Sequence, residues 1–301
     1  MNWSPPNKVI IQGITEPGVI SHALQMKAYG TDIVAGVSPG QGGKTIDDIP
    51  VFDLVEQVST ITKKIDTTLV FVPPYQVLDA VKEAISTGIK KAIVFTSNVP
   101  PLDTIKLIEC AQSNDTLILG PNSDGIIIPE RALLGKFQPQ FYRAGKVGSI
   151  ATSKYLSYEL VAELNRAEIG QSIIISLGSD LITGSNLSQW LSILNEDPDT
   201  EAIVSIGKRI KDAEEIATFC QNSDSTKPII SYTVGLKTPQ DRMTGDAVSI
   251  ISNHLSVSVP AANQERRILN KLKRAGVKVA KRPSEIPAML SEIFANRVDS
   301  K

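Results

Sequence analysis

The sequence is poor in the residues that most often carry reactive chemistry. Its 301 residues include two histidines and two cysteines. His22, His254, Cys110 and Cys220 are spaced too widely for the usual structural zinc site, so we expect this chain to bind no metal. Two cysteines that lie far apart in sequence are typical of reduced thiols, which favours a cytoplasmic protein.

Long apolar runs and an excess of charge of either sign are also missing. No apolar run approaches the ~18 residues that cross a bilayer, and the first residues, MNWSPPNK, lack the pattern of a signal peptide. Lys and Arg total 31 against 32 Asp and Glu, which leaves no basic surplus for nucleic-acid phosphates. We therefore expect neither a membrane nor nucleic acid as a partner. With 42% hydrophobic and 21% charged residues, the chain is too apolar for disorder, and its length fits about two domains.

Short β-branched runs alternate with amphipathic stretches along the whole chain. This alternation predicts an α/β fold with parallel sheets that are covered by helices on both faces. The aperiodic segment around 135–146 is the best linker candidate. We predict one domain at 1–137, a linker at 138–145 and a second domain at 146–301. The predicted strands are 8–13, 31–37, 68–74, 91–96, 116–122, 146–151, 171–178, 201–207, 227–235 and 277–280.

Two glycine-containing loops follow the first two predicted strands. The loop GITEPG, from Gly13 to Gly18, leads into the first predicted helix, where backbone N–H groups and the helix dipole attract phosphate. The loop GVSPGQGGKT, residues 36–45, carries four glycines and Lys44, but it lacks the four-residue spacer of a P-loop. Because the ends of parallel strands share one sheet edge, the two loops together predict a nucleotide-like ligand there.

Several longer runs of the sequence are similar to one known family. They include PVFD (50–53), FVPP (71–74), GPNSDGIIIPE (120–130), GSDLITGSN (178–186) and LNEDPDTEAIVSIG (194–207). In this order they resemble the α subunit of succinyl-CoA synthetase, a family that includes related acid–CoA ligases and ATP-citrate lyase. The resemblance covers nearly the whole chain. It implies an N-terminal Rossmann-like domain that binds coenzyme A (CoA) and a C-terminal flavodoxin-like domain that carries a phosphorylated histidine.

In the family, that phosphohistidine passes a phosphoryl group between an acyl phosphate and a nucleotide on a β subunit, and here the reacting positions differ. Asp246 stands where the family has the histidine, and Lys208 stands where it has a neighbouring glutamate. Lys154 replaces a glycine in the family's phosphate-binding turn. A carboxylate is a weaker nucleophile than a neutral imidazole. We interpret the three changes as a loss of selection for phosphohistidine chemistry.

The CoA site that the resemblance implies is altered as well. Glu16 and Val19 stand where the family has glycines, and a carboxylate at this loop repels a pyrophosphate. Gln41 replaces a lysine that meets the cofactor in the family, although Lys44 is close in sequence. The resemblance therefore implies a weakened CoA site. Its predicted contacts are Gly13, Thr15, Glu16, Pro17, Gly18, Gln41, Lys44, Pro73, Thr96, Ser97 and Asn122.

Two further residues match family positions near the acid substrate and the subunit interface, Ser153 and Tyr158. A retained Tyr158 beside a lost reaction predicts a retained hetero-oligomer with an ATP-grasp β-like partner. The preferred hypothesis is a pseudo-enzyme that binds CoA or a nucleotide-like ligand with this partner. Two alternatives stay open. One is an active ADP- or GDP-forming acid–CoA ligase subunit, phosphorylated for instance on Asp246; the other is a histidine-less relative that works in acyl or carbamoyl transfer.

Overall fold

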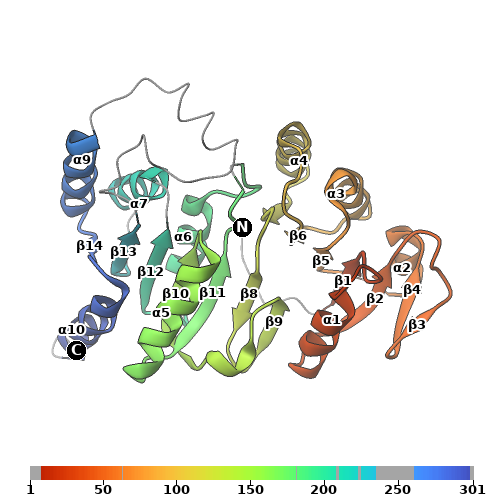
Figure 1. Cartoon of the computed structure of the whole chain (residues 1–301), viewed down its shortest axis with the longest axis horizontal. Helices are drawn as coiled ribbons and strands as arrows, with labels where there is room; N and C mark the ends of the chain where they lie inside the picture. The colour runs from red at the N-terminus through yellow and green to blue at the C-terminus, as the bar shows by residue number, and fades with distance from the viewer. Residues whose placement is uncertain are drawn as a thin grey trace.

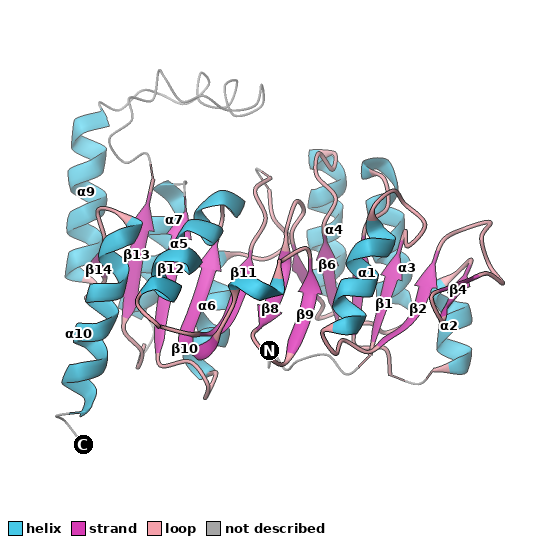
Figure 2. Ribbon diagram, turned by 60° about the horizontal axis from the view of Figure 1, so that its bottom comes forward, coloured by secondary structure: helices cyan, strands magenta, loops and turns pink. Residues whose placement is uncertain are grey.

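The chain forms two seven-stranded sheets that lie side by side along an elongated molecule (Figure 1). The structure, a computed structural model, describes residues 8–62, 64–180, 182–207, 210–222, 225–234 and 261–298. Helices pack on both faces of each sheet, which confirms the predicted α/β architecture (Figure 2). No helix in these ranges is long and apolar enough to cross a membrane.

The first sheet and its helices are built from residues 9–119. Its strands are β1 (Val9–Gln12), β2 (Ile33–Val37), β3 (Thr45–Ile46), β4 (Ile49–Phe52), β5 (Thr67–Val70), β6 (Lys91–Val94) and β7 (Leu117–Leu119). Its helices are α1 (Val19–Ala28), α2 (Val55–Ile61), α3 (Val77–Ser86) and α4 (Pro101–Ser113), with a 3-10 turn η1 (Pro74–Gln76). The strand order is β3-β4-β2-β1-β5-β6-β7, and all pairs are parallel except β3–β4.

The second sheet takes its strands from residue 125 onward. They are β8 (Gly125–Ile128), β9 (Ala132–Gly135), β10 (Ala144–Ala151), β11 (Gln171–Ser176), β12 (Ala202–Gly207), β13 (Ile229–Thr233) and β14 (Lys278–Val279). The helices are α5 (Lys154–Arg166), α6 (Leu187–Glu196), α7 (Ile210–Asn222), α9 (Ala261–Arg274) and α10 (Ile286–Val298), with 3-10 turns η2 (Pro139–Phe141) and η4 (Pro283–Glu285). The order is β14-β13-β12-β10-β11-β8-β9, and β8 runs antiparallel to both β11 and β9.

The apolar strands are buried on both faces because successive side chains point to opposite sides of a sheet. Val9 and Ile11 of β1 face the layer of α1, whereas Ile10 packs with α2 and α3. In the second sheet, α5 and α10 cover one face, and α6, α7 and α9 cover the other. Near-continuous burial of this kind explains why the sequence shows apolar runs rather than a strict alternation.

The β8–β9 hairpin links the two sheets. Its pairing partner in the ladder is β11, but it also packs on α1 of the first sheet. The Thr31 hydroxyl donates to the carbonyl of Leu133 at 2.6 Å, and the Glu130 N–H donates to the Tyr29 hydroxyl at 2.7 Å. A single apolar cluster runs from α1 through the hairpin to α6 and α7.

Sheet pairing does not follow the predicted boundary at residue 137, since β8 and β9 precede it and yet belong to the second sheet. The division into 1–137, 138–145 and 146–301 stays a prediction about folding units. The expectation of parallel sheets holds for most pairs, but each sheet also contains antiparallel ones. Within the predicted linker, η2 is followed after two residues by β10, which begins at Ala144.

Candidate functional site

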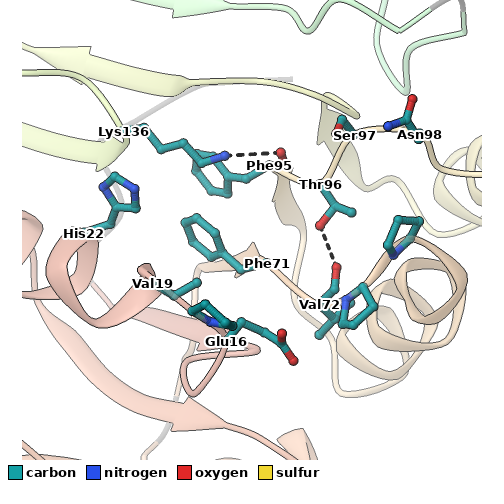
Figure 3. A pocket seen from close by; sticks show the side chains of 13 residues that line it. Glu16, Val19, His22, Phe71, Val72, Phe95, Thr96, Ser97, Asn98 and Lys136 are labelled. Atoms are coloured by element: carbon teal, nitrogen blue, oxygen red, sulfur yellow. Dashed lines mark hydrogen bonds between the residues drawn. The ribbon is translucent and has the colours of Figure 1, made fainter.

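A cavity of about 420 Å³ opens where β5 and β6 end, at the carboxyl edge of the first sheet. This is the edge at which open parallel sheets bind their ligands. Figure 3 shows the cavity between the loop after β1, the two segments that follow β5 and β6, and Lys136 from beyond β9. It is lined by Glu16, Pro17, Val19, His22, Phe71, Val72, Pro73, Pro74, Phe95, Thr96, Ser97, Asn98 and Lys136.

The Gly13–Gly18 loop depends on left-handed backbone at both ends. Gly13 has φ +81° and is buried, and a Cβ there would lie 2.9 Å from the backbone nitrogen of Val72. Gly18 has φ +79° and forms the N-cap of α1, with open space around it. Between them the N–H of Glu16 donates to the Gly13 carbonyl at 3.0 Å. The loop is therefore a tight turn that opens α1, as the sequence predicted.

Two phenylalanines form an aromatic wall of the cavity. The rings of Phe71 and Phe95 stack with centroids 4.2 Å apart and planes within 5°. The His22 imidazole, 6.4 Å from Phe71, continues this stack. The Lys136 ammonium lies over both phenylalanine rings, 5.6 Å and 5.4 Å from their centroids. An apolar wall with a cation over it suits a ligand that combines an uncharged chain with negative groups.

The second glycine loop lies beside the first, as predicted from the strand order. The hydroxyls of Thr15 and Ser38 are 2.7 Å apart and share a hydrogen bond, and β1 and β2 are neighbours. The Lys44 ammonium donates to the side-chain carbonyl of Gln41, so these two predicted contacts do lie together. Neither of them lines the cavity next to Glu16. They form an outer part of the same sheet edge.

A second cavity of about 280 Å³ lies at the carboxyl edge of the second sheet. Its walls include Ser153 at the N-cap of α5, Asn122, and Lys136 from the first cavity. The Asn122 amide donates to the Asp180 carboxylate at 2.9 Å. The whole lining is Asn122, Asp124, Lys136, Thr152, Ser153, Tyr155, Ser176, Gly178 and Ser179.

Beneath this cavity lies a buried pair, Thr152 and Asp212. The Thr152 hydroxyl donates to the Asp212 carboxylate at 2.9 Å, and both residues are almost fully buried. Gly207 leaves room for the pair, because a Cβ there would lie 2.6 Å from the Thr152 hydroxyl oxygen. The pair connects the end of β10 to the first turn of α7 and so fixes one wall of the cavity.

Tyr158 lies on α5, half-buried against the apolar core. Its ring is 6.4 Å from that of Tyr142, which is itself buried. Burial raises the pKa of the Tyr142 phenol far above its ordinary value, and the neighbouring Tyr158 and Asp124 raise it further. Tyr142 is therefore a neutral packing residue. The role of Tyr158 at a subunit interface stays a prediction.

The cavities bring together some of the predicted site residues and not others. Glu16, Pro17, Pro73, Thr96 and Ser97 line the first cavity, whereas Asn122 and Ser153 line the second. Gly13, Thr15 and Gly18 shape the loop without lining it. Lys208 and Asp246 lie outside the described residues. Among the described residues, no group of three or more His, Cys, Asp or Glu is placed to hold a metal ion.

Four residues of the first cavity with aromatic or basic side chains were missed by reasoning from the sequence. Phe71 and Phe95 come directly after β5 and β6, so their position in the sequence already indicated that they lie at the sheet edge. His22 was not among the predicted site residues, but it lines the cavity. Lys136 was assigned to the end of the first domain, and no local pattern indicates that it crosses to this cavity.

These residues fit CoA in shape and polarity, with one exception. The left-handed glycines allow backbone N–H groups to approach a pyrophosphate. The aromatic wall offers an apolar surface to a pantetheine chain, and Lys136 and Lys44 supply positive charge at the two ends of the edge. The Glu16 carboxylate opposes a diphosphate at the same loop.

The sequence matches two family models in the corresponding places. Residues 5–98 match the CoA binding domain, and residues 144–286 match the succinyl-CoA ligase like flavodoxin domain. Over 285 residues the chain is 34% identical to the succinate–CoA ligase [ADP-forming] subunit alpha of Staphylococcus aureus strain Mu50. The matched region covers 95% of this chain and 92% of the relative. The chain belongs to the succinate–CoA ligase α-subunit family. The protein of the same name from Staphylococcus epidermidis is also 34% identical, and the matched region covers 94% of this chain and 91% of that relative.

Solved structures share the fold of this α-subunit family member. An ATP citrate lyase variant from Methanosaeta concilii, in complex with (3S)-citryl-CoA, superposes with a TM-score of 0.82 at 16% identity. It covers 98% of this chain, which spans 50% of that structure. The dinucleotide-forming acetyl-CoA synthetase 1 of Ca. Korarchaeum cryptofilum gives 0.70 at 23% identity, over 92% of this chain and 58% of its own. At these identities the likeness concerns the fold alone.

Proposed function

We propose that this chain is a CoA-binding α-like subunit that works with an ATP-grasp β-like partner and no longer transfers phosphate through a histidine. The observation that carries the proposal is the first cavity, in which a left-handed glycine turn, an aromatic wall and a lysine converge at one sheet edge. The family match to a CoA binding domain supports the ligand class. CoA is bound more weakly than in the relatives, because Glu16 places a negative charge at the phosphate loop.

Each part of CoA has a counterpart along this sheet edge, in the first cavity or beside it. The Gly13–Gly18 loop holds the pyrophosphate, and Lys44 is a cation on the neighbouring loop. The adenine lies toward residues 38–43. The pantetheine chain runs past Pro73, Thr96 and Ser97 toward Asn122. CoA supplies a thiol that forms thioesters; the residues named here bind and orient it.

Titration calorimetry with CoA tests the ligand. We expect binding by the unmodified protein and about tenfold weaker binding by Lys44→Ala, because one charged hydrogen bond to phosphate contributes about 1–3 kcal/mol. Lys82→Ala, which removes an exposed lysine from α3, is the matched control and leaves the affinity unchanged. If no binding is seen at millimolar CoA, the proposal fails and the domain is a scaffold.

Loss of phosphohistidine transfer rests on Asp246 and Lys208, which differ from the family's histidine and glutamate. With an ATP-grasp partner and ATP or GTP, we expect no acid-labile phosphate by mass spectrometry and no succinyl-CoA. Asp246→His alone does not restore turnover, since Lys208 supplies no carboxylate to orient the imidazole. Stoichiometric phosphorylation on Asp246 would favour the alternative of an active ADP- or GDP-forming ligase, which agrees with the names of the relatives.

The partner is proposed from the family, whose curated members are named as subunits. Affinity purification of the tagged chain from its own cells is expected to recover an ATP-grasp protein in a fixed ratio. Tyr158→Ala weakens this complex if Tyr158 forms part of the interface. Recovery of the free chain alone contradicts the partner, and it leaves the CoA measurement intact as an independent test.

A further inference from the structure

Lys136 comes from one sheet and places its charge at the other. Its backbone N–H donates to the carbonyl of Asp124 at 3.0 Å, beside the β8–β9 hairpin of the second sheet. Its ammonium donates to the carbonyl oxygen of Phe95 at 3.4 Å, at the end of β6 in the first sheet. Figure 3 shows the side chain reaching over the rings of Phe71 and Phe95 from the opposite side of the cavity to Glu16.

Lys136 also lines both cavities. The first cavity is lined in part by the loop that opens α1, and the second is lined in part by Asn122 and Ser153. Among the described residues, Lys136 is the one lysine or arginine that lines both cavities. Consider an extended ligand with one end at the Gly13–Gly18 loop and the other end near Asn122. The Lys136 ammonium lies close to the end of the ligand that is near Asn122.

In CoA, the group farthest from the diphosphate is the thiol. We propose that Lys136 binds the sulfur of CoA and holds it as a thiolate where the two cavities meet. This inference rests on the proposed function, because it requires CoA to lie along the first cavity. It adds a specific role for a residue that belongs to neither predicted loop.

The charges around the proposed contact decide whether the thiol or the thiolate of CoA is stabilised. A nearby ammonium stabilises a thiolate and so lowers the pKa of the thiol, which for a cysteine side chain is ordinarily ~8.5. His22 of α1 faces the same cavity, and the carboxylates of Glu16 and Asp124 line the two cavities on either side of Lys136. Asp180 is hydrogen-bonded to Asn122 in the second cavity. Of these groups, Lys136 lies on the path from one cavity to the other, so we expect its charge to prevail and the thiol proton to pass to solvent.

The experiment compares CoA with desulfo-CoA, in which hydrogen replaces the thiol group, by titration calorimetry between pH 6 and about pH 9. The unmodified protein is expected to prefer CoA, with a preference that rises to about tenfold as the thiol ionises, which corresponds to a one-unit shift. Titrations in buffers of different ionisation enthalpy are expected to show a fraction of a proton released on binding CoA, at most about half for a one-unit shift, and none on binding desulfo-CoA.

Lys136→Met is expected to abolish the preference and the proton release, with the affinity for desulfo-CoA changed less than twofold. Lys136→Arg is expected to keep part of the preference and part of the proton release. Lys44→Ala is expected to weaken the binding of CoA and of desulfo-CoA equally. Equal weakening of both ligands by Lys136→Met, or no preference in the unmodified protein, overturns the inference and leaves CoA binding standing. Failure of both CoA and desulfo-CoA to bind the unmodified protein overturns the proposed function instead, and this inference with it. Because the preference is first measured on the unmodified protein, a misfolded variant cannot hide the result.

Discussion

The carboxyl edges of the two sheets show opposite kinds of construction. The first is shaped by backbone, with Gly13 and Gly18 in left-handed conformations and two stacked phenylalanines as a wall. The second is held by side chains, such as the buried Thr152–Asp212 pair. The first edge therefore depends on a few glycines for its shape, and the second depends on particular side-chain pairs. This difference fits the proposed function, in which a ligand cavity is kept and the residues that react are changed.

The largest difference between the edges is expected from glycine replacement. Gly13→Ala combines a left-handed φ with a Cβ 2.9 Å from the Val72 backbone nitrogen, so it destabilises folding by about 3–5 kcal/mol. Gly18→Ala keeps the left-handed strain but enters open space, and it costs about 1–2 kcal/mol. Urea unfolding of both variants measures this. Equal losses would show that the close approach at Gly13 is relieved by movement of the segment that follows β5.

The second edge is expected to lose stability without losing ligand. Thr152→Val removes the hydroxyl that donates to Asp212 and leaves a buried carboxylate short of one hydrogen bond, which costs about 1–3 kcal/mol. The CoA affinity stays within twofold. Ser192→Ala, which removes an exposed hydroxyl on α6, is the control and changes stability by less than about 0.5 kcal/mol. A large loss of CoA affinity in Thr152→Val would mean that the two edges are coupled.

At the first edge a change of charge is expected to matter less than a change of shape. Glu16→Gln removes the carboxylate from the phosphate loop and tightens CoA binding about twofold to fivefold, in keeping with the ~0.2–1 kcal/mol of exposed charge pairs. Glu109→Gln on α4 is the control with the same loss of charge. The gain shrinks in about 1 M salt, where screening is strong. A gain that persists there argues for a steric effect.

The smallest expected effect concerns a carboxylate in the second half of the chain that lines neither cavity. The Lys281 N–H donates to Glu285 at 2.9 Å, and this bond, with the Arg282 guanidinium, lowers the pKa of the carboxyl. A lowered folded pKa stabilises the fold above the unfolded pKa, and the contribution disappears as pH falls through the folded pKa. Glu285→Gln therefore lowers the melting temperature at pH 7, and the difference vanishes in acid. A difference that is constant with pH contradicts the assignment.

Much of the fold was predictable because it depends on local pattern. Apolar β-branched runs predicted β1, β2, β5, β6 and β7, and the restart of the pattern near residue 146 predicted the second sheet. The position of the hairpin was not predictable, because GIII and ALLG are suitable for either sheet. Its partner β11 lies about fifty residues further along the chain and is selected by tertiary packing.

The site divided in the same way. Gly13 and Gly18 were predicted correctly as the turn before α1, because a strand followed by a glycine turn and a helix is a local pattern. The cavity's Lys136 was not, because its reach across to Phe95 depends on how two distant segments pack. The reacting positions Lys208 and Asp246 lie outside the described residues, and their roles stay predictions.

The β8–β9 hairpin has a consequence for any attempt to cut the protein in two. Residues 1–137 on their own would carry Gly125–Ile128 without the strand that completes its ladder, leaving a bare row of N–H and C=O groups beside buried isoleucines. Open strand edges of this kind recruit other chains and promote aggregation. A truncation at residue 124 instead would strip the apolar cover from α1. Either cut removes packing that the hairpin supplies to both sheets, so we expect each half on its own to unfold or aggregate.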